Sequence, residues 1–313
     1  MPGVPVNVEN FVRAETDRMF ASFVAQTGGV NRLAHNRVPT PIDRQTVIRM
    51  NRDTLYSYAV VDVSEGATVT IPDAGDRYVS VMAVNQDHYV NRIFHGPGEH
   101  PLTLDELETP WVTVAARVLL DPSDPADVEV VNALQDGLAV EAASAKPFVP
   151  GDYDADSLDA TRKALLELAR GLTGFDRAFG SRSDVDPVRH LLGTAAGWGG
   201  LPDSEARYVG VEPNLPVGEY RLTVRDVPVD GFWSVSVYNR DGFFEENDRA
   251  AYSVNNLTAH PNDDGSITIS FGGGDESPNP IPIVHGWNYT VRLYRPRPEI
   301  LDGSWTFPAL EPA

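Results

Sequence analysis

The 313-residue chain contains no cysteine. Disulfide bonds, thiol nucleophiles, iron–sulfur clusters and thiolate zinc sites are therefore excluded, and any metal ion would have to bind histidine or carboxylate side chains. No apolar run approaches the roughly 20 residues that a membrane-spanning helix needs. The first residues also lack the basic and apolar stretches of a signal peptide, so the simplest expectation is a cytoplasmic protein.

Basic side chains are scarce as well. The chain has 25 lysine and arginine residues against 45 aspartate and glutamate residues, which gives a formal net charge of −20 at pH 7. Such a surface repels a phosphate backbone or an anionic membrane, so we expect neither a nucleic acid nor a membrane as partner. A small-molecule ligand remains as the expected partner, and a homo-oligomer is compatible with the same composition.

The clearest pattern lies in residues 231–239, where Trp233, Val235 and Val237 alternate with Ser234 and Ser236. A period of two is typical of a strand, and this pattern predicts a strand with one dry face. The same period recurs in residues 267–271 and 289–294. Together the three segments predict one antiparallel sheet system around Trp233.

The rest of the chain predicts a mainly β (α+β) fold. Short β-type runs separated by turns lie at 47–63, 77–84 and 111–120 and favour a sandwich. Helical spacing predicts helices over 8–24, from Pro125 and from about 158 to 172, with Gly28 ending the first and Asp124 capping the second. We expect a flexible turn at 193–202. These patterns predict two antiparallel, jelly-roll-like β-sandwich domains, 1–150 and 204–313, joined by a helical connector at 151–203.

Several separated motifs carry a family resemblance. Asn51-Arg-Asp-Thr-Leu-Tyr-Ser57 with Ile71-Pro-Asp73 resembles the first of two bacterial domains of unknown function, numbered 1254 and 1214. Phe232-Trp-Ser-Val-Ser-Val-Tyr238, Tyr252-Ser-Val-Asn-Asn256 and Arg292-Leu-Tyr-Arg-Pro296 resemble the second. The resemblance implies two mostly β domains, the second similar to a jelly roll, and implies no reaction. The family usually has Asn-Trp-Leu-Pro where this chain has Asn279-Pro-Ile-Pro282, so we expect no aromatic ligand shelf there.

The segment 51–57 is the first candidate site. Asp53 is suited to act as a general base or as a metal ligand, with Arg52 binding an acidic group, Tyr56 donating a hydrogen bond and Asn51 contacting the substrate. The alternative is structural: Asp53 and Asn51 would hold a turn through bonds between side chain and backbone.

The segment 85–100 is the second candidate site, and its polar residues predict a loop. His88 and His95 are candidate ligands of a divalent metal, with further acidic and histidine side chains nearby. Their spacing matches no known metal motif, and solvated surface histidines explain it as well. The candidate substrate contacts in this segment are Asn85, Asp87 and Asn91.

Other chemistries leave weaker signals. Gly-x-Ser-x-Gly is absent, which argues against a nucleophilic serine of the hydrolase kind. A pair of carboxylates of the glycosidase kind stays open, because many acidic residues are available. Trp287 and Trp305 are candidates for an exposed aromatic platform, with a place in the core as the alternative. His285 is either a general base or a turn residue.

These observations predict a small-molecule enzyme, a hydrolase or lyase without an organic cofactor. Its polar or sugar-like substrate would bind in a cleft where the two domains meet, with Asp53 or His88 as acid or base. The alternative is a non-catalytic ligand-binding or self-assembling β-sandwich protein.

Overall fold

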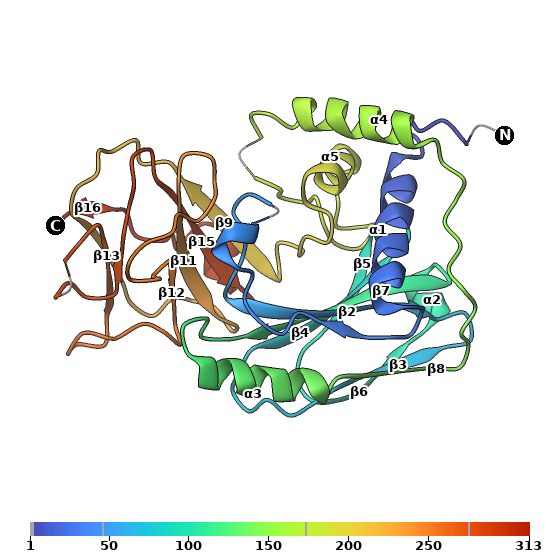
Figure 1. The fold of residues 1–313 in the computed structure, drawn as a ribbon, viewed down its shortest axis with the longest axis horizontal. Helices are drawn as coiled ribbons and strands as arrows, with labels where there is room; N and C mark the ends of the chain where they lie inside the picture. The colour runs from blue at the N-terminus through green and yellow to red at the C-terminus, as the bar shows by residue number, and fades with distance from the viewer. Residues whose placement is uncertain (1–2, 46, 173, 275) are drawn as a thin grey trace. The chain divides into compact units, whose positions relative to one another are not determined.

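The computed structural model describes residues 3–45, 47–172, 174–274 and 276–313. The chain forms two compact units. Unit 1 comprises residues 1–37, 55–119 and 130–203, and unit 2 comprises residues 38–54, 120–129 and 204–313. The helices that were predicted as a connector, within 151–203, belong to unit 1. Figure 1 shows the labelled helices and strands of the chain.

Unit 1 contains two sheets. The larger has the strand order β1-β2-β7-β4-β5, and its ladders β1/β2, β4/β5 and β4/β7 are antiparallel. The smaller has the order β6-β3-β8 and is antiparallel. Their strands are β1 (Ala34–His35), β2 (Thr54–Asp62), β3 (Ala67–Ile71), β4 (Val79–Asn85), β5 (Val90–Phe94), β6 (Gly98–Leu102), β7 (Trp111–Leu119) and β8 (Ala139–Ala142).

Helices cover the larger sheet of unit 1. Helices α1 (Phe11–Thr27), α4 (Ala155–Leu168) and α5 (Pro187–Gly197) pack together through Phe11, Leu158, Leu192 and neighbouring apolar side chains. Figure 1 shows them on one side of the five-stranded sheet, with β3, β6 and β8 on the other. Two further α-helices in the described part of residues 1–203 are α2 (Leu104–Leu107) and α3 (Pro125–Asp136).

Two predicted helix boundaries are confirmed, the end of α1 at Gly28 and the start of α3 at Asp124. Gly28 adopts φ 74° after α1, and its amide donates to the carbonyl oxygen of Val24. Only glycine takes this left-handed conformation at little cost. At the start of α3, the Asp124 carboxylate accepts from the Ala126 amide at 2.9 Å, which is the predicted cap.

Unit 2 is a β-sandwich. One sheet has the order β14-β13-β10-β16 and the other β12-β11-β15-β9. All of their ladders are antiparallel except the short parallel pair β13/β14. The elements are η1 (Ile42–Arg44), β9 (Ala206–Val211), β10 (Tyr220–Val224), β11 (Trp233–Tyr238), β12 (Ser253–Asn255), β13 (Ile267–Phe271), β14 (Pro280–Ile281), β15 (Asn288–Tyr294), α6 (Pro298–Leu301) and β16 (Glu311–Pro312).

The core of unit 2 lies between its two sheets. Trp233, Val235 and Val237 of β11 meet Ile269 and Phe271 of β13 in one buried cluster. This confirms the strands that the period of two predicted, and it confirms a mainly β fold of the α+β class. Among the described residues, no helix has the length and apolar content to cross a membrane.

Two local predictions were wrong. Residues 85–100 do not form one loop, because β5 lies within them and β6 begins at Gly98. Val90 and Phe94 are buried at the two ends of β5, and the polar residues between them hid this short strand. Residues 193–197 are not a turn but the end of α5. The packing around Gly193 leaves no room for a side chain in this helix. A Cβ atom at this position would lie 2.8 Å from the Cβ of Ala178 and 3.1 Å from the Phe179 ring.

Gly193 therefore makes a stability prediction. Alanine gains about 1 kcal/mol over glycine in a helix interior, but overpacking a core costs about 1–3 kcal/mol. We expect Gly193→Ala to lower the free energy of unfolding by up to about 2 kcal/mol, measured by urea denaturation. Gly210→Ala is the control, since the nearest atom to an added Cβ is 4.0 Å away. A Gly193→Ala protein more stable than wild type would contradict the packing argument.

Candidate functional site

The outer face of the sheet β12-β11-β15-β9 carries polar side chains that are nevertheless buried. We call this set the polar layer: Ser234, Ser236, Tyr238, Asn255, Thr290 and Arg292. Each of them is 5% exposed or less. The predicted strand with one dry face is therefore corrected, because both faces of β11 are buried.

A distant segment of unit 2 covers the polar layer. The guanidinium of Arg292 donates to the carbonyl oxygens of Arg49 at 2.7 Å and Met50 at 3.3 Å. The Tyr238 hydroxyl donates to the Met50 carbonyl at 2.9 Å, and the Asn51 amide donates to the Tyr294 hydroxyl at 3.1 Å. The sequence separation of about 190–240 residues explains why sequence patterns did not pair these segments.

Arg292 is the cation at the centre of the polar layer. It also donates to the Ser236 hydroxyl at 2.8 Å and to the Tyr238 hydroxyl at 2.6 Å. Burial by itself would lower the pKa of Arg292, but Tyr238, Tyr294 and Asp53 outweigh it and raise the pKa. Burial raises the pKa of Tyr238, against the opposing effect of Arg292. Arg292 is therefore a permanent positive charge beside a protonated phenol.

Asp53 lies on the same layer and is completely buried. Its Oδ1 accepts from the Asn255 amide at 3.2 Å and from the Ser253 hydroxyl at 3.4 Å. Its Oδ2 is buried and has no hydrogen-bond partner in the protein. Its backbone amide donates to Asn51 Oδ1 at 2.8 Å. The structural and the functional predictions for segment 51–57 therefore apply to different atoms. Asn51 holds the turn, whereas Oδ2 of Asp53 has no structural role.

Arg52 is held against an aromatic ring. Its guanidinium lies 5.5 Å from the centroid of Tyr252 and donates to the Thr40 carbonyl oxygen. Burial lowers the pKa of Arg52, against the opposing effects of Tyr252 and Asp53. The side chain thus fixes the position of Tyr252, next to Ser253, instead of pointing into open solvent.

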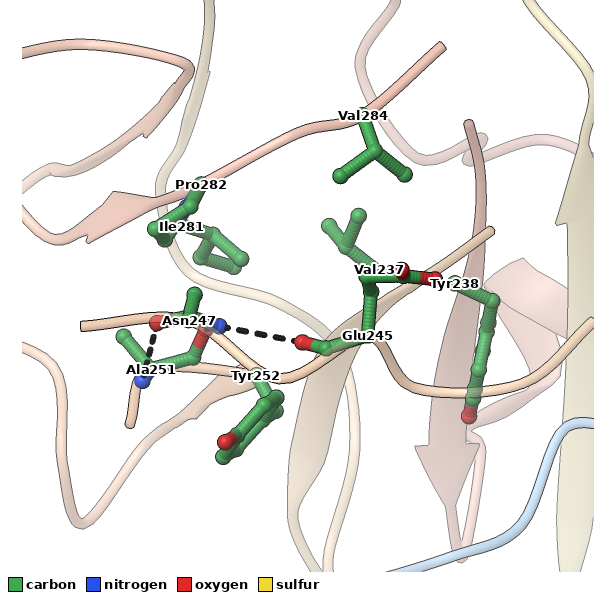
Figure 2. Close-up of a pocket in the computed structure, with 9 residues that line it drawn as sticks. All are labelled: Val237, Tyr238, Glu245, Asn247, Ala251, Tyr252, Ile281, Pro282 and Val284. Atoms are coloured by element: carbon green, nitrogen blue, oxygen red, sulfur yellow. Dashed lines mark hydrogen bonds between the residues drawn. The ribbon is translucent and has the colours of Figure 1, made fainter. Parts of the chain in front are cut away.

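A small hollow lies at one end of the sandwich (Figure 2). The space open to the centre of a water molecule is about 20 Å³, close to what one ordered water needs. Within the lining segment, the Oδ1 of Asn247 accepts from the Ala251 amide at 3.2 Å. The lining residues are Val237, Tyr238, Glu245, Asn247, Ala251, Tyr252, Ile281, Pro282 and Val284.

His88 occupies a separate place, in unit 1, and it is fully buried. Its Nε2 accepts from the Gly199 amide at 2.8 Å, and its Nδ1 lies 2.7 Å from the Thr194 hydroxyl. That hydroxyl donates to the His190 carbonyl at 2.8 Å, so it accepts from His88, and the proton of the neutral ring is on Nδ1. Burial and the neighbouring His190 ring hold the pKa of His88 well below its usual value.

These contacts correct the predicted roles of His88. Both ring nitrogens are used inside unit 1, so neither is free to bind a metal or to take a proton from a substrate. The ring stacks on Trp198 at 5.2 Å and on His190 at 5.5 Å, and His190 stacks on Tyr89 at 4.7 Å. His88 is therefore part of a packed column of rings that fixes α5 to the turn between β4 and β5.

The other predicted residues of segment 85–100 are likewise held by local structure. Asn85 is buried, and its Oδ1 accepts from the amides of Asp87 and Tyr89 at 2.9 and 3.0 Å. The Asp87 carboxylate pairs with Arg13 at 2.7 Å. The Asn91 amide donates to the Glu106 carbonyl at 2.7 Å. These bonds stabilise a turn and its neighbours.

The two histidines predicted as metal ligands, His88 and His95, are each hydrogen-bonded to other groups of the protein. His95 Nδ1 lies 3.2 Å from the Val79 carbonyl oxygen, whereas His88 is bonded to Thr194 and Gly199. Within the described residues, no group of three or more histidine and acidic side chains is arranged to hold a metal ion.

Two predicted aromatic contacts also lie elsewhere. Tyr56 is half-buried in unit 1, with the Arg117 guanidinium 5.4 Å from its ring centroid. Trp287 is only 2% exposed and packs against Phe271 and Tyr220 in the sandwich core. The prediction of Trp287 as an exposed ligand platform is therefore wrong, because the turn before β15 points the indole inward. His285 lies in that turn and accepts from Arg240 at 3.1 Å.

Comparisons with known proteins agree with the motifs. Residues 30–100 match "Protein of unknown function (DUF1254)", and residues 214–298 match "Protein of unknown function (DUF1214)". The chain carries DUF1254 followed by DUF1214. Asp53 thus comes from the DUF1254 region, whereas all residues of the polar layer come from the DUF1214 region.

Solved structures share the fold. The VPA0106 protein from Vibrio parahaemolyticus is 18% identical, with a TM-score of 0.74, and the match covers 98% of this chain and 97% of that one. A putative uncharacterized protein from Burkholderia cenocepacia is 15% identical, with a TM-score of 0.54, and the match covers 96% of this chain and 86% of that one. No curated protein matches this DUF1254–DUF1214 chain.

Sequence reasoning missed Arg292, Tyr238 and Asn255 as site residues. Arg292 had one usable signal, since a charged residue at an alternating strand position within an apolar pattern needs a buried partner or solvent. The serines of β11 lacked such a signal, because serine is common on exposed strand faces.

The polar layer predicts a large loss of stability in Arg292→Met. Removing one partner of a buried charge group typically costs about 3–5 kcal/mol, and here it also takes the Arg292 donor away from the Arg49 carbonyl and from the Ser236 and Tyr238 hydroxyls. Urea denaturation measures this loss. Arg221→Met is the control, because Arg221 is exposed on β10 and should change the free energy by less than about 0.5 kcal/mol. Equal effects of the two variants would contradict the role of Arg292.

His88 predicts a pH dependence in the acid range. Its pKa is lowered in the folded protein, so below about pH 6.5 the unfolded chain binds one proton more than the folded chain. Stability must then fall as the pH drops below that value, by at most about 1.4 kcal/mol per pH unit from this group. Urea midpoints at pH 7 and pH 5.5 test this. The urea midpoint of His88→Asn should change less between the two pH values than that of the wild-type protein. An equal change in both proteins would contradict the assignment of this pH dependence to His88.

Proposed function

We propose that this DUF1254–DUF1214 protein is a small-molecule enzyme, a hydrolase or lyase without an organic cofactor, with Asp53 as general base. The substrate is a polar or sugar-like molecule that reaches the polar layer of unit 2. The single observation behind the proposal is Asp53 Oδ2, a buried carboxylate oxygen without a protein partner, next to the permanent charge of Arg292.

The energetics support a functional reading of that oxygen. Leaving a buried acceptor unsatisfied costs about 1–3 kcal/mol, and more for a charged group. Most buried side-chain polar atoms have a partner, so an exception needs an explanation such as a catalytic role or a bound molecule. The same carboxylate has a well-held Oδ1, on Asn255 and Ser253. An oriented carboxylate with one unused oxygen is the arrangement that a general base requires.

Arg292 has a complementary role in the proposal. Its charge is fixed by the hydrogen bonds to Ser236, Tyr238 and two backbone carbonyls. A preoriented cation stabilises negative charge that develops in a transition state, and it does so strongly where water is excluded. Arg52 contributes indirectly, because it holds Tyr252 at the edge of the layer.

Access to the layer requires movement. Asp53 is completely buried and does not line the hollow beside Tyr238 and Tyr252. That hollow is about 20 Å³, which is far smaller than pockets for drug-sized ligands of about 300–1,000 Å³. We therefore include in the proposal that residues 245–252 move outward when the substrate binds.

The proposal extends to surroundings and partners. With a net charge of −20, a small neutral molecule is a better partner than a nucleic acid or a membrane surface. A bacterial, cytoplasmic setting and a jelly-roll-like second domain remain our predictions from the sequence. A divalent metal is not part of the proposed mechanism.

A binding or self-assembling protein is the second candidate. Strand β9 is the outer strand of its sheet, and Tyr208 and Val209 on it are 46% and 38% exposed. Outer strands with exposed apolar side chains pair readily with other chains. Light scattering after gel filtration tests this candidate: a dimer that Val209→Glu converts to a monomer would support it, and a monomeric wild-type protein would contradict it.

Asp53→Asn tests the enzyme proposal. Asparagine keeps the shape and the acceptor that faces Asn255, so we expect a melting temperature within about 4 °C of wild type. A screen of sugars, polyols and other polar metabolites should find compounds that raise the melting temperature of the wild-type protein. We expect turnover of such a compound to fall at least about 100-fold in Asp53→Asn.

The matched control for this test is Asp264→Asn. Asp264 is an exposed carboxylate in the same unit, paired with Arg225, and its replacement should leave the ligand response intact. An Asp53→Asn protein that is largely unfolded would make Asp53 a structural residue. Unchanged turnover would also refute its role as base.

A further inference from the structure

Three side chains of the polar layer lie in one row across the sheet. Ser234 of β11 is directly opposite Asn255 of β12 on one side and Arg292 of β15 on the other. Directly opposite side chains project from the same face, with Cβ atoms about 4.5–5.5 Å apart. The Asn255 amide bonds Asp53 Oδ1. Asp53 is thus bonded to the side chain directly opposite Ser234, in the row that also contains Arg292.

Ser234 and Asp53 each leave an oxygen atom unused. Both residues are 0% exposed, and neither Ser234 Oγ nor Asp53 Oδ2 has a hydrogen-bond partner in the protein. A serine hydroxyl can donate to a carboxylate, so direct contact would have satisfied both atoms. Two unpaired polar atoms on neighbouring positions are instead the setting in which a third oxygen bridges them.

We infer that Asp53 Oδ2 and Ser234 Oγ form a subsite for one hydroxyl-type oxygen. Water occupies it in the free protein, and a hydroxyl group of the substrate replaces that water in the complex. The part about the substrate rests on the proposed function, whereas the part about water does not. Ser234 is a positioning residue in this inference, because it orients the oxygen from which Asp53 accepts a hydrogen bond.

The charges at the subsite select a neutral ligand. Asp53 Oδ2 is an acceptor, so the bound oxygen has to carry a hydrogen, which a carboxylate or phosphate oxygen at neutral pH lacks. Arg292 does not reverse this preference, since both of its terminal nitrogens already donate to protein oxygens. The subsite therefore fits a hydroxyl group, such as one of a sugar or sugar alcohol, and it disfavours a carboxylate or phosphate group.

Thr290 provides a matched comparison within the same layer. Its hydroxyl is also buried and without a protein partner, but it lies opposite Ser236, on β15. Its position is one row along the sheet from Ser234 and two strands away from β12, whose side chains hold Asp53. Removing the Thr290 hydroxyl should therefore leave the subsite unchanged.

A crystal structure of the free protein tests the first part. We expect one ordered oxygen within about 3.2 Å of both Asp53 Oδ2 and Ser234 Oγ. That density should disappear in Ser234→Ala and persist in Thr290→Val. A direct hydrogen bond between Asp53 and Ser234, an empty space between them, or density that survives in Ser234→Ala would overturn the inference. Those results would not refute Asp53 as base, which the loss of turnover in Asp53→Asn tests separately.

Soaks of the wild-type crystals with mannitol and with gluconate test the second part. We expect a mannitol hydroxyl to replace the bridging water, and we expect the carboxylate group of gluconate to stay out of the subsite. A carboxylate oxygen of gluconate at the subsite would overturn the preference for a neutral ligand. Water retained in both soaks would overturn the substrate assignment, while the bridging water itself would stand.

Discussion

Burial of the Arg292 charge is the constraint on which unit 2 depends. A guanidinium inside a protein must find acceptors for its donors, since an unpaired buried charge costs several kcal/mol. The sheet supplies Ser236 and Tyr238, and the backbone of Arg49 and Met50 supplies carbonyl oxygens. The segment before β2 is thereby bound to a sheet formed by the last third of the chain. Asp53 is placed where it is as a consequence of that attachment.

The two candidate sites differ in how completely their polar atoms are satisfied. In unit 1, His88 uses both ring nitrogens and packs between two rings. In unit 2, Asp53 uses one carboxylate oxygen and leaves the other unpaired. Stability favours a hydrogen bond for every buried polar atom, whereas a functional site tolerates buried polar atoms without a partner. This difference, and not the residue type, separates the structural histidine from the candidate base.

The sequence predicted the sandwich core of unit 2 well, because its signal is local. Trp233, Val235 and Val237 alternate with serines, and that period directly reflects the geometry of a strand. Capping at Asp124 and the left-handed Gly28 were predictable for the same reason, since both depend on neighbouring residues. The motif around Asp53 was found through the family resemblance. The sequence did not predict that only one carboxylate oxygen of Asp53 is hydrogen-bonded, because its partner Asn255 lies about 200 residues later in the chain.

Local periodicity and capping chemistry thus determined the strands, two helix boundaries and the mainly β class from the sequence alone. Only the tertiary structure decided that the serine face of β11 is buried, that Trp287 points inward and that His88 has no free nitrogen. The physical reason is that burial and hydrogen-bond satisfaction depend on which distant segment covers a surface. Alternation in a strand shows that two faces differ, but the chain that packs on each face determines what those residues can do.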